Sequence, residues 1–467
     1  MRSTAKSAPV ELRPEHRITG DGNTADGAVA VMKFSDALTY LDRHINREAV
    51  AGAYQGLSLH VMEELLDAMG SPHRDYPVVH VTGTKGKGTT VALASQLFAS
   101  VGVSAGSYTS PHVSSITERI ARNGVAISEE EFAAAIETVS RFVPLISGTP
   151  SYFELLTAAA FRWFADEAVD VGVIEVGLLG RFDATNVVEG RIAVVTGIGK
   201  DHTDGAEGWR FHVAGEKAGI VKPGATLVLG AIDDDLVPVF EAEQPGRVLR
   251  LGHQIEVTSN TMAVGGRLVD IATPWGRHED IYLPLHGRHQ ADNVALAITV
   301  VEAFFDRHVG DDIINEGLAE VALPGRSEVA GREPLVVLDG AHNPDSAKAL
   351  ARTLRDEFGA AADRYLVVGM LGGRDARELL SALEAPLAEL VLICAPDSPR
   401  AQDVADVAAA ARALGCRVEE IASVTDAVDR ALALAGDDDL VAVTGSFYTV
   451  GEARGHLLAD TADDGSS

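Results

Sequence analysis

Short apolar runs alternate with longer helical patterns over most of the chain. VVHVTG (78–83) is almost wholly apolar and precedes TTVALASQLFASVG (89–102), whose apolar spacing predicts a helix. VDVGVIEVG (169–177) and IAVVTGIG (192–199) repeat the strand pattern. Nearly continuous apolar strands joined by helical crossovers are typical of parallel sheets covered on both faces. The pattern predicts an α/β fold whose functional groups lie at the carboxyl ends of the strands.

The alternation is interrupted and then restarts, which predicts two domains. Residues from about 225 to 285 are richer in Gly, Pro and alternating patterns, and we expect short strands or hairpins in an accessory region there. After a turn at LPGR (323–326), a second doubly wound domain of ordinary size is expected. Its predicted strands are PLVVLDG (334–340), YLVVGML (365–371), ELVLICAP (389–396) and DLVAVTGSF (439–447).

These patterns set the expected domain boundaries. The larger domain is expected at 32–323, a linker at 324–330 and the smaller domain at 331–457. Residues 1–31 are polar and Gly-rich and are expected to form a disordered leader, and 458–467 are expected to form an acidic tail.

Charge and composition narrow the classes of partner. The formal net charge of −29 over 467 residues argues against nucleic acid or an anionic membrane as the main partner, so an anionic ligand requires a locally basic site. Cys394 and Cys416 both lie in segments that resemble core, which suits a reducing compartment. Neither a spanning apolar run nor a signal peptide is apparent. We expect a cytoplasmic protein that is a monomer and binds small molecules.

A glycine-rich segment, GTKGKGTT (83–90), lies between a predicted strand and a predicted helix. In that context, backbone N–H groups and a helix N-terminus are directed at phosphate oxygens. Gly83, Gly86 and Gly88 allow close approach of the backbone, Lys87 supplies positive charge, and the Thr89 hydroxyl is placed to face a magnesium ion. The alternative is a tight turn that needs glycine only for its conformation.

Charged residues follow the next predicted strands. Glu175 ends one apolar strand, where an unpaired carboxylate would be costly and a cation would compensate. Asp201 and His202 follow another strand and are expected at the same sheet edge as the phosphate loop. Lys217 is compatible with a plain surface lysine on a helix.

Many segments in order resemble the folylpolyglutamate synthase and dihydrofolate synthase family, a branch of the Mur ligase superfamily. The resemblance extends from about residue 38 to 455. It is carried by HVTGTKGKGTT (80–90), YTSPHVSSITERIARNGVAI (108–127), SYFELLTAAAFRWFA (151–165), IEVGLLGRFDATNVV (174–188), DHTDG (201–205), GEKAGIVKPG (215–224), GRHQADNVALA (287–297), LPGRSEV (323–329), LDGAHNPDSA (338–347) and VTGSFYTVGEAR (443–454).

The resemblance implies a fold and a reaction. The fold would be a P-loop-containing, Mur-ligase-like ATPase domain with a mostly parallel sheet, followed by a smaller Rossmann-like α/β domain. The reaction would be ATP-dependent ligation through an acyl phosphate, adding L-glutamate to dihydropteroate, to (tetrahydro)folate or to both. Residues matching the family's ATP contacts are Gly83, Thr84, Lys85, Gly86, Lys87, Gly88, Thr89, Thr90, Asn293, Arg326, Asp339 and His342.

Metal and acceptor sites are also implied by the resemblance. Thr89 and Glu175 would hold one Mg²⁺, and His202 with Lys217 would help to hold a second, the lysine being carbamylated. Potassium is a further candidate cation, and Lys87, His202 and Lys217 are the expected catalytic residues. The expected acceptor residues are Ser110, Pro111, His112, Arg181, Asp183 and Thr185.

Some positions depart from the family pattern and keep alternatives open. Lys85 replaces a usual asparagine, Leu179 replaces a glycine near the expected acceptor site, and Arg374 replaces a common lysine. One alternative is a paralogue that joins an amino acid to a different carboxylate. Another is an ATP-binding regulatory module without catalysis, which the retained metal and phosphate residues argue against.

Overall fold

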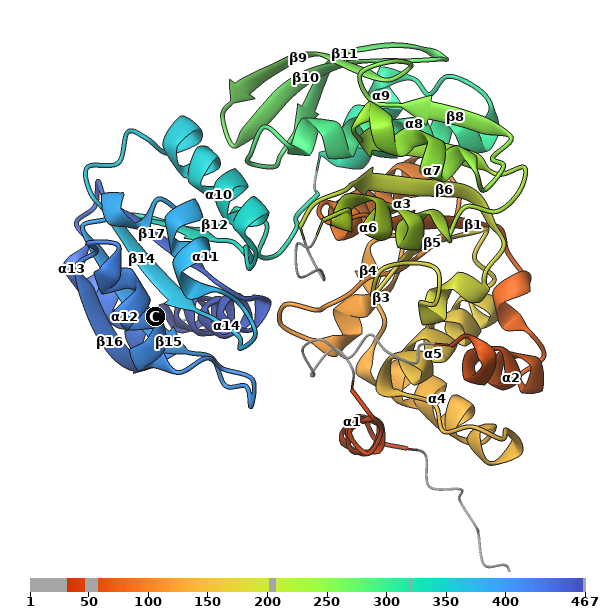
Figure 1. The fold of residues 1–467 in the computed structure, drawn as a ribbon, viewed down its shortest axis with the longest axis horizontal. Helices are drawn as coiled ribbons and strands as arrows, with labels where there is room; N and C mark the ends of the chain where they lie inside the picture. The colour runs from red at the N-terminus through yellow and green to blue at the C-terminus, as the bar shows by residue number, and fades with distance from the viewer. Residues whose placement is uncertain (1–31, 47–57, 201–206, 320, 465–467) are drawn as a thin grey trace, which may run out of the picture.

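The computed structural model of the protein describes residues 32–46, 58–200, 207–319 and 321–464. They form two α/β bodies, the larger on the right of Figure 1 and the smaller, in blue, on the left. Two large, mostly parallel sheets confirm the α/β fold expected from the sequence. The expected leader at 1–31 lies outside the described residues.

The larger body is built on an eight-stranded sheet in the order β4-β3-β2-β5-β1-β6-β7-β8. Strands β2 and β5 to β8 pair in parallel with their neighbours around β1, whereas β3 and β4 add an antiparallel edge. The strands are β1 (Val78–Thr82), β2 (Ala105–Tyr108), β3 (Ile120–Arg122), β4 (Val125–Ala126), β5 (Val171–Glu175), β6 (Gly190–Gly197), β7 (Thr226–Ala231) and β8 (Arg247–Arg250).

Both faces of this sheet are covered, which explains the nearly continuous apolar strands. Val79 and Val81 point into a core shared with α3 (Lys87–Ser100) and α8 (Gln290–Phe305). Val78 points to the other face. The helices there are α1 (Phe34–Asp42), α2 (His60–Ala68), α4 (Glu129–Ser140) and α5 (Tyr152–Asp166). Beside the outer strands lie α6 (Trp209–Ala218) and α7 (Val237–Glu241).

A small antiparallel sheet forms an accessory layer over α8, seen in green at the top of Figure 1. Its strands are β9 (Glu256–Ala263), β10 (Gly266–Thr273) and β11 (Gly276–Leu283), and α9 (Asp311–Leu318) packs beside β11. Hairpins are therefore confirmed for residues 256–283, whereas the expectation of an accessory region is wrong for β7 and β8, which extend the main parallel sheet.

The smaller body contains a six-stranded sheet in the order β12-β13-β17-β14-β15-β16. All pairs are parallel except β12 with β13. The strands are β12 (Glu328–Arg332), β13 (Leu335–Leu338), β14 (Arg364–Gly369), β15 (Leu390–Ala395), β16 (Val418–Ser423) and β17 (Leu440–Thr444). The helices are α10 (Pro344–Glu357), α11 (Ala376–Ala382), α12 (Val404–Ala413), α13 (Val424–Leu434) and α14 (Phe447–Asp464).

Several details differ from the sequence-based expectations. Strand β12 begins at Glu328, so the end of the segment expected as a linker belongs to the smaller sheet. Helix α14 continues to Asp464, through most of the expected tail. Cys394 is buried, but Cys416 is only half-buried, so the expectation of two core thiols is wrong for Cys416. Within the described ranges, no helix has both the length and the apolar character to cross a bilayer.

Candidate active site

Residues from both bodies line one cleft of about 1450 Å³. The phosphate loop, the end of β5 and the start of α8 contribute from the larger body, and the residues around the start of α10 contribute from the smaller one. The predicted site residues that line the cleft are Thr84, Lys85, Gly86, Lys87, Gly88, Thr89, Ser110, Pro111, Glu175, Asp183, Asn293, Arg326, Asp339 and His342. Predicted His202 lies outside the described residues.

The phosphate loop needs glycine at specific positions. Gly83 and Gly86 have φ of 146° and 77°, and Gly86 is the N-cap of α3. A Cβ on Gly83 would come within 1.9 Å of Thr196 Oγ1, and one on Gly86 within 2.3 Å of Asn293 Oδ1. Thr84 N donates a hydrogen bond of 3.0 Å to Gly197 O, which fixes the loop to β6. The N-terminus of α3 therefore faces the cleft, where its dipole favours an anion.

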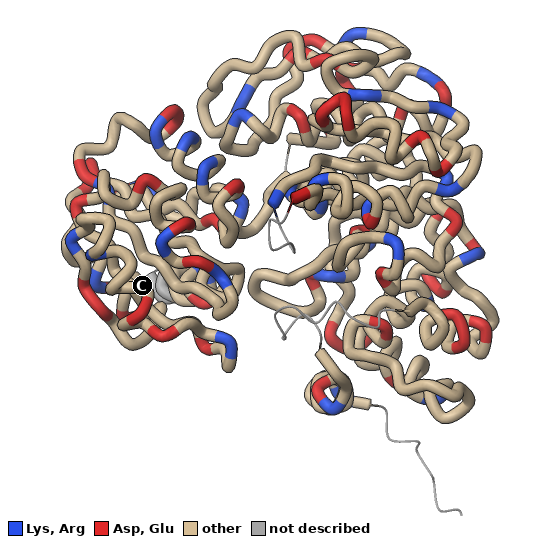
Figure 2. The backbone as a smooth tube through the Cα atoms, in the orientation of Figure 1, with Lys and Arg blue, Asp and Glu red and all other residues tan. Residues whose placement is uncertain are grey.

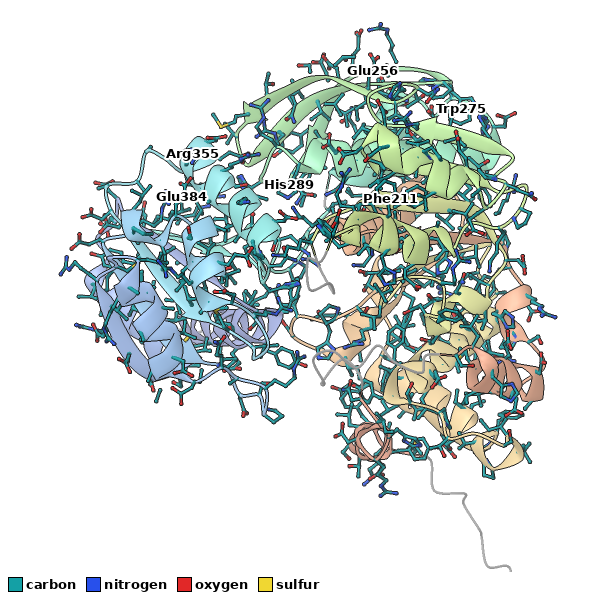
Figure 3. All side chains as sticks on the ribbon, viewed as in Figure 1. Phe211, Glu256, Trp275, His289, Arg355 and Glu384 are labelled. Carbon is teal, nitrogen blue, oxygen red and sulfur yellow. The ribbon has the colours of Figure 1, made fainter. Side chains whose placement is uncertain are left out.

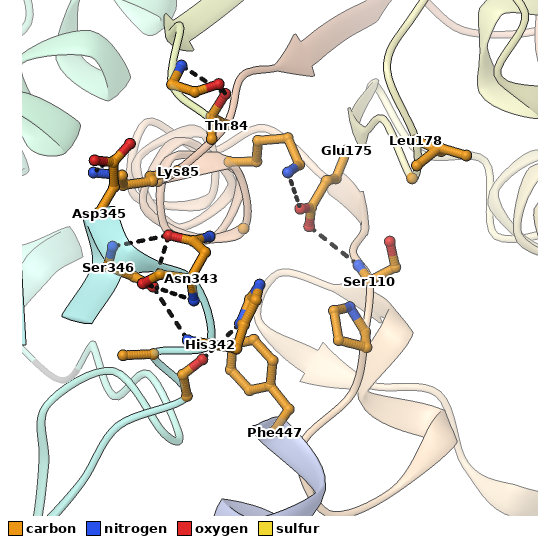
Figure 4. A pocket seen from close by; sticks show the side chains of 18 of the residues that line it. Thr84, Lys85, Ser110, Glu175, Leu178, His342, Asn343, Asp345, Ser346 and Phe447 are labelled. Atoms are coloured by element: carbon orange, nitrogen blue, oxygen red, sulfur yellow. Dashed lines mark hydrogen bonds and ion pairs between the residues drawn. The ribbon is translucent and has the colours of Figure 1, made fainter. Parts of the chain in front are cut away.

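Glu175 lies beside this loop at the end of β5 and is only 3% exposed. Its Oε2 accepts a hydrogen bond from Ser110 N at 3.1 Å, and its Oε1 lies 3.9 Å from Lys87 Nζ (Figure 4). Burial raises the pKa of the Glu175 carboxyl, while the charges of Lys87 and Arg326 act in the opposite direction. Such a carboxylate gains from a cation in the cleft.

Lys217 is buried behind the loop. It lies in α6, is 4% exposed, and its Nζ donates a hydrogen bond of 3.0 Å to Gly83 O. The interpretation of Lys217 as a surface lysine is therefore wrong. Lys217 does not line the main cleft, but it borders a void of about 10 Å³ together with Gly83 and Lys87. Thr90 is also fully buried behind the loop.

Basic groups gather where the two bodies meet. Lys85 Nζ lies 3.7 Å from Asp345 Oδ2 on α10, and Lys200 Nζ lies 3.5 Å from Glu378 Oε1 on α11. Figure 2 shows further basic residues along α10. Burial lowers the pKa of Lys85, opposed by Asp345 and assisted by Lys348 and Arg352. This is the locally basic site that an anionic ligand requires on an acidic protein.

The linker is held by the smaller body. Asp339 Oδ2 accepts hydrogen bonds from the backbone N and the Oγ of Ser327, both at 2.8 Å, and its Oδ1 accepts from Ala341 N at 2.9 Å. The Arg326 guanidinium lies 4.3 Å from the centre of the Phe447 ring, a cation–π contact. Arg326 is thereby held at the cleft by groups of the smaller body.

His342 and the start of α10 form the facing wall. His342 Nδ1 donates a hydrogen bond of 2.7 Å to Gly340 O, which directs the ring, 5.6 Å from that of Phe447. Asn343 caps α10 by accepting a hydrogen bond from Ser346 N at 2.9 Å (Figure 4). A second helix N-terminus therefore faces the cleft.

The expected acceptor residues divide into two groups. Ser110, Pro111 and Asp183 line the cleft, whereas the others do not. Thr185 is fully buried and hydrogen-bonded to Asp183 Oδ1 through its N at 3.0 Å and to His80 Nε2 at 2.9 Å. Arg181 pairs with Glu243 and donates to Gly215 O, and His112 Nδ1 accepts from Arg119 Nε at 3.0 Å.

Several apolar residues of the cleft were not predicted from the sequence. They are Ile45, Val61, Phe153, Leu178 and Phe182. Figure 4 shows Leu178 on the side of Glu175 opposite to Lys85 and Asp345. Phe153 and Phe182 belong to family-like segments, but nothing in their spacing distinguishes a phenylalanine of a cleft from one of the core. Phe447, under Arg326, was missed for the same reason.

The fold and the cleft agree with known proteins. Residues 81–301 match the Mur ligase middle domain, and 325–447 match the Mur ligase glutamate ligase domain. A dihydrofolate synthase/folylpolyglutamate synthase of Mycobacterium tuberculosis is 39% identical over 438 residues, covering 85% of this chain and 89% of the relative.

Two solved structures are similar throughout. Folylpolyglutamate synthase of M. tuberculosis, complexed with ADP and AMPPCP, has a TM-score of 0.84 at 36% identity, covering 91% of this chain and 98% of the other. Bifunctional folylpolyglutamate synthase/dihydrofolate synthase of Yersinia pestis, complexed with AMPPNP and Mn ion, has a TM-score of 0.78 at 28% identity, covering 91% and 98%.

The two bodies and the glycine loop at their cleft define a Mur-type ligase, an enzyme class that uses ATP to form carbon–nitrogen bonds. Within that class, the chain belongs to the dihydrofolate synthase/folylpolyglutamate synthase family.

Proposed function

We propose that the protein adds L-glutamate to dihydropteroate, to reduced folate or to both, with ATP cleaved to ADP and phosphate. The observation that carries this proposal is the cleft itself, which brings Lys87, Glu175 and Arg326 together with the apolar side chains described above. The names of the relatives support the choice of glutamate and a pterin-bearing acid.

In this mechanism the cleft overcomes the repulsion between two anions. The acceptor carboxylate attacks the γ-phosphorus of ATP, and the bond between this phosphorus and the oxygen that bridges the β- and γ-phosphates breaks, which releases ADP. The glutamate amine then attacks the carbonyl carbon of the acyl phosphate and displaces phosphate. Lys87 and the N-terminus of α3 stabilise the charge on the transferred group. Arg326 and His342, held at the facing wall, are positioned to contact the nucleotide and to exclude water that would hydrolyse the intermediate.

The residues fit a divalent ion. Glu175 offers a buried carboxylate with a raised pKa, and a Cβ built on Gly88 would lie 3.2 Å from its Oε2, so the first turn of α3 lies against it. Oxygen donors of this type suit Mg²⁺. We propose that Glu175 and the Thr89 hydroxyl hold this ion, which when bound offsets the phosphate charge. Glu175→Gln should shift the Mg²⁺ dependence of turnover to higher concentration.

We also propose that Lys217 supports a second cation after carbamylation. Lys217 is buried near Lys87, and carbamylation would replace its positive charge with a negative one. The adjoining void of about 10 Å³, however, is only about the size of one water molecule. Carbamate formation therefore requires the Lys217–Gly83 hydrogen bond to break. A ¹³C NMR signal from protein equilibrated with ¹³CO₂ that is absent in Lys217→Arg would indicate the carbamate. A dependence of turnover on K⁺ would test potassium as a further cation.

One observation favours a second candidate acceptor. Leu179 has a φ of 59°, a left-handed conformation that suits the glycine usual in the family better than leucine. The neighbouring Leu178 lines the cleft, so this change lies next to the acceptor wall. A different carboxylic acid is therefore the alternative substrate.

The deciding experiment measures ATP-dependent phosphate release and product mass with glutamate and a panel of acids. Dihydropteroate and tetrahydrofolate are expected to yield products heavier by one glutamyl unit. Turnover with another acid and none with either pterin would favour the alternative. No turnover with any acid would refute the ligase proposal.

A further inference from the structure

A second cluster of ligand-type side chains lies in the accessory layer. His278 is in β11, Glu302 is in the last turns of α8, and His308 follows α8. One ligand atom from each of the three lies within 4.8 Å of the others. His278 Nε2 and His308 Nδ1 are 3.2 Å and 3.1 Å from the same oxygen, Glu302 Oε1. Two imidazoles and a carboxylate therefore converge on one point.

Neighbouring groups orient these ligands. Asp311 Oδ1 lies 2.7 Å from His278 Nδ1, so both ring nitrogens of His278 face carboxylate oxygens, and a neutral ring, with one N–H, can donate to only one of them. Thr273 Oγ1 donates a hydrogen bond of 2.5 Å to Glu302 Oε2, and Val309 N donates one of 3.0 Å to Oε1, the oxygen that the two rings also face. Carboxylate and hydroxyl partners of this kind are the usual outer shell of histidine-rich metal sites.

The cluster requires a cation. His278 and Glu302 have fully buried side chains, and a neutral His278 would direct a lone pair at a carboxylate oxygen. A proton is one cation that meets the requirement, and a metal ion bound by all three side chains is the other.

Space and access also suit an ion. A Cβ on Gly276 would come within 2.6 Å of His308 Nδ1, so the glycine makes room for this ring. The His308 side chain is 41% exposed, which opens the cluster to solvent. The two rings are stacked with centroids 4.7 Å apart and 14° between planes. Coordination requires these planes to open, because a ligating imidazole holds its metal in the ring plane, and exposed His308 has room to turn.

We propose that His278, Glu302 and His308 bind a zinc-type divalent transition-metal ion, with solvent water as the fourth ligand. Two nitrogens and one carboxylate oxygen suit Zn²⁺, whereas Mg²⁺ prefers oxygen alone. The ion would tie β11 to the end of α8. Trp275 lies close to the cluster, because its backbone N donates a hydrogen bond to Thr273 Oγ1. In Figure 3, Trp275 is at the end of the accessory layer that is far from the smaller body, whereas His289, a residue of the cleft, lies between the bodies. The site is thus separate from the ligase cleft.

Zinc titration of the chelator-treated, full-length protein in excess Mg²⁺ tests the proposal. One equivalent of Zn²⁺ is expected to bind and to release protons from the imidazoles. His308→Ala should weaken binding at least tenfold, and Asp311→Asn should weaken it by about 10–100-fold through the orientation of His278. His253→Ala is the matched control, because His253 is exposed beside a carboxylate, Asp234, 3.8 Å away. It should bind zinc like the parent protein.

His308→Ala carries the test because it changes an exposed ring, and unchanged ligase turnover in that variant would verify its folding. X-ray absorption at the zinc edge should report two imidazoles in the parent protein and one in His308→Ala. Failure of the parent to bind zinc, or equal binding by the parent and His308→Ala, would overturn the proposal and leave a proton as the cation of the cluster.

Discussion

Arg267 in β10 and Glu357 at the end of α10 form an ion pair whose side chains are only 3% and 4% exposed. Glu357 also accepts hydrogen bonds from His286 Nδ1 and Gly287 N, each at 3.0 Å. This contact joins the accessory layer to the smaller body, so a buried ion pair holds the two bodies together in addition to the linker and the more exposed pairs of Lys85 with Asp345 and Lys200 with Glu378.

Glu357→Gln should weaken this attachment, because it leaves the charge of Arg267 buried without its counterion. Loss of one partner of a buried pair typically costs about 3–5 kcal/mol. We expect a lower urea midpoint for the variant. Glu384→Gln is the control, since Glu384 pairs with Arg355 on the surface of the same body (Figure 3) and should change the midpoint little. Equal effects of the two variants would contradict a special role for Glu357.

Acid should weaken the same contact. Burial alone would raise the pKa of Glu357, but the hydrogen bonds from His286 and Gly287 and the charge of Arg267 together lower it. A lowered folded-state pKa stabilises the fold above the ordinary carboxyl pKa, and this stabilisation is lost as pH falls through the folded-state value. Between pH 6 and about pH 3, stability should therefore fall less steeply in Glu357→Gln than in the parent. If stability fell equally steeply with pH in the two proteins, Glu357 would not contribute to the pH dependence.

Gly86→Ala should abolish nucleotide binding at a moderate cost in stability. Gly102 is a matched control because its φ of 82° is close to the 77° of Gly86, yet a Cβ there would meet nothing within 4 Å. Both variants place an alanine in the left-handed conformation, which costs roughly 1–2 kcal/mol of folding stability. Only Gly86→Ala also drives a methyl group into Asn293, so calorimetry should show lost ATP binding for that variant alone.

Lys87→Ala should reduce turnover by at least about 10²-fold, because in the proposed mechanism the charge of Lys87 stabilises the transferred phosphate. Its circular dichroism spectrum should match that of the parent, since the side chain contacts the cleft and is not part of a core cluster. Phosphate release in the steady state measures the effect. A rate within threefold of the parent, at saturating ATP, would remove Lys87 from the mechanism.

Thr185→Val should destabilise the fold without changing the KM for the acceptor. The substitution removes the hydroxyl between His80 and Asp183, and leaving buried polar groups unpaired costs about 1–3 kcal/mol. Thermal unfolding and acceptor titration together separate the two roles. A raised KM with an unchanged melting temperature would show that Thr185 contacts the acceptor.

The sequence predicted best those features that depend on local chain geometry. The phosphate loop is recognised from glycines within a single turn. Glu175 ends a strand of the same parallel sheet, and because the carboxyl ends of parallel strands lie at one edge, its position beside the loop could be predicted. Helix α3 begins at Lys87 instead of the expected 89, because Gly86 adopts the left-handed N-cap that starts the helix earlier.

Features that depend on packing between distant segments were not predicted. Lys217 is buried because α6 lies against the loop at Gly83, and its spacing within α6 does not show this. Thr185 was assigned to the acceptor site by resemblance, but in the structure it forms hydrogen bonds with His80 and Asp183. The contact of Arg267 with Glu357 joins residues far apart in the chain, with no motif around either.

Hydrogen bonds attach the linker to the smaller body. Gly340 N donates to Gly325 O at 2.8 Å, and Asp339 holds Ser327, so the chain from Gly325 onward moves with the smaller body. Separation of the two bodies would therefore carry Arg326 away from Glu175, which belongs to the larger body. Because the charge of Arg326 lowers the pKa of the Glu175 carboxyl, an open cleft would leave this acid more readily protonated than a closed one.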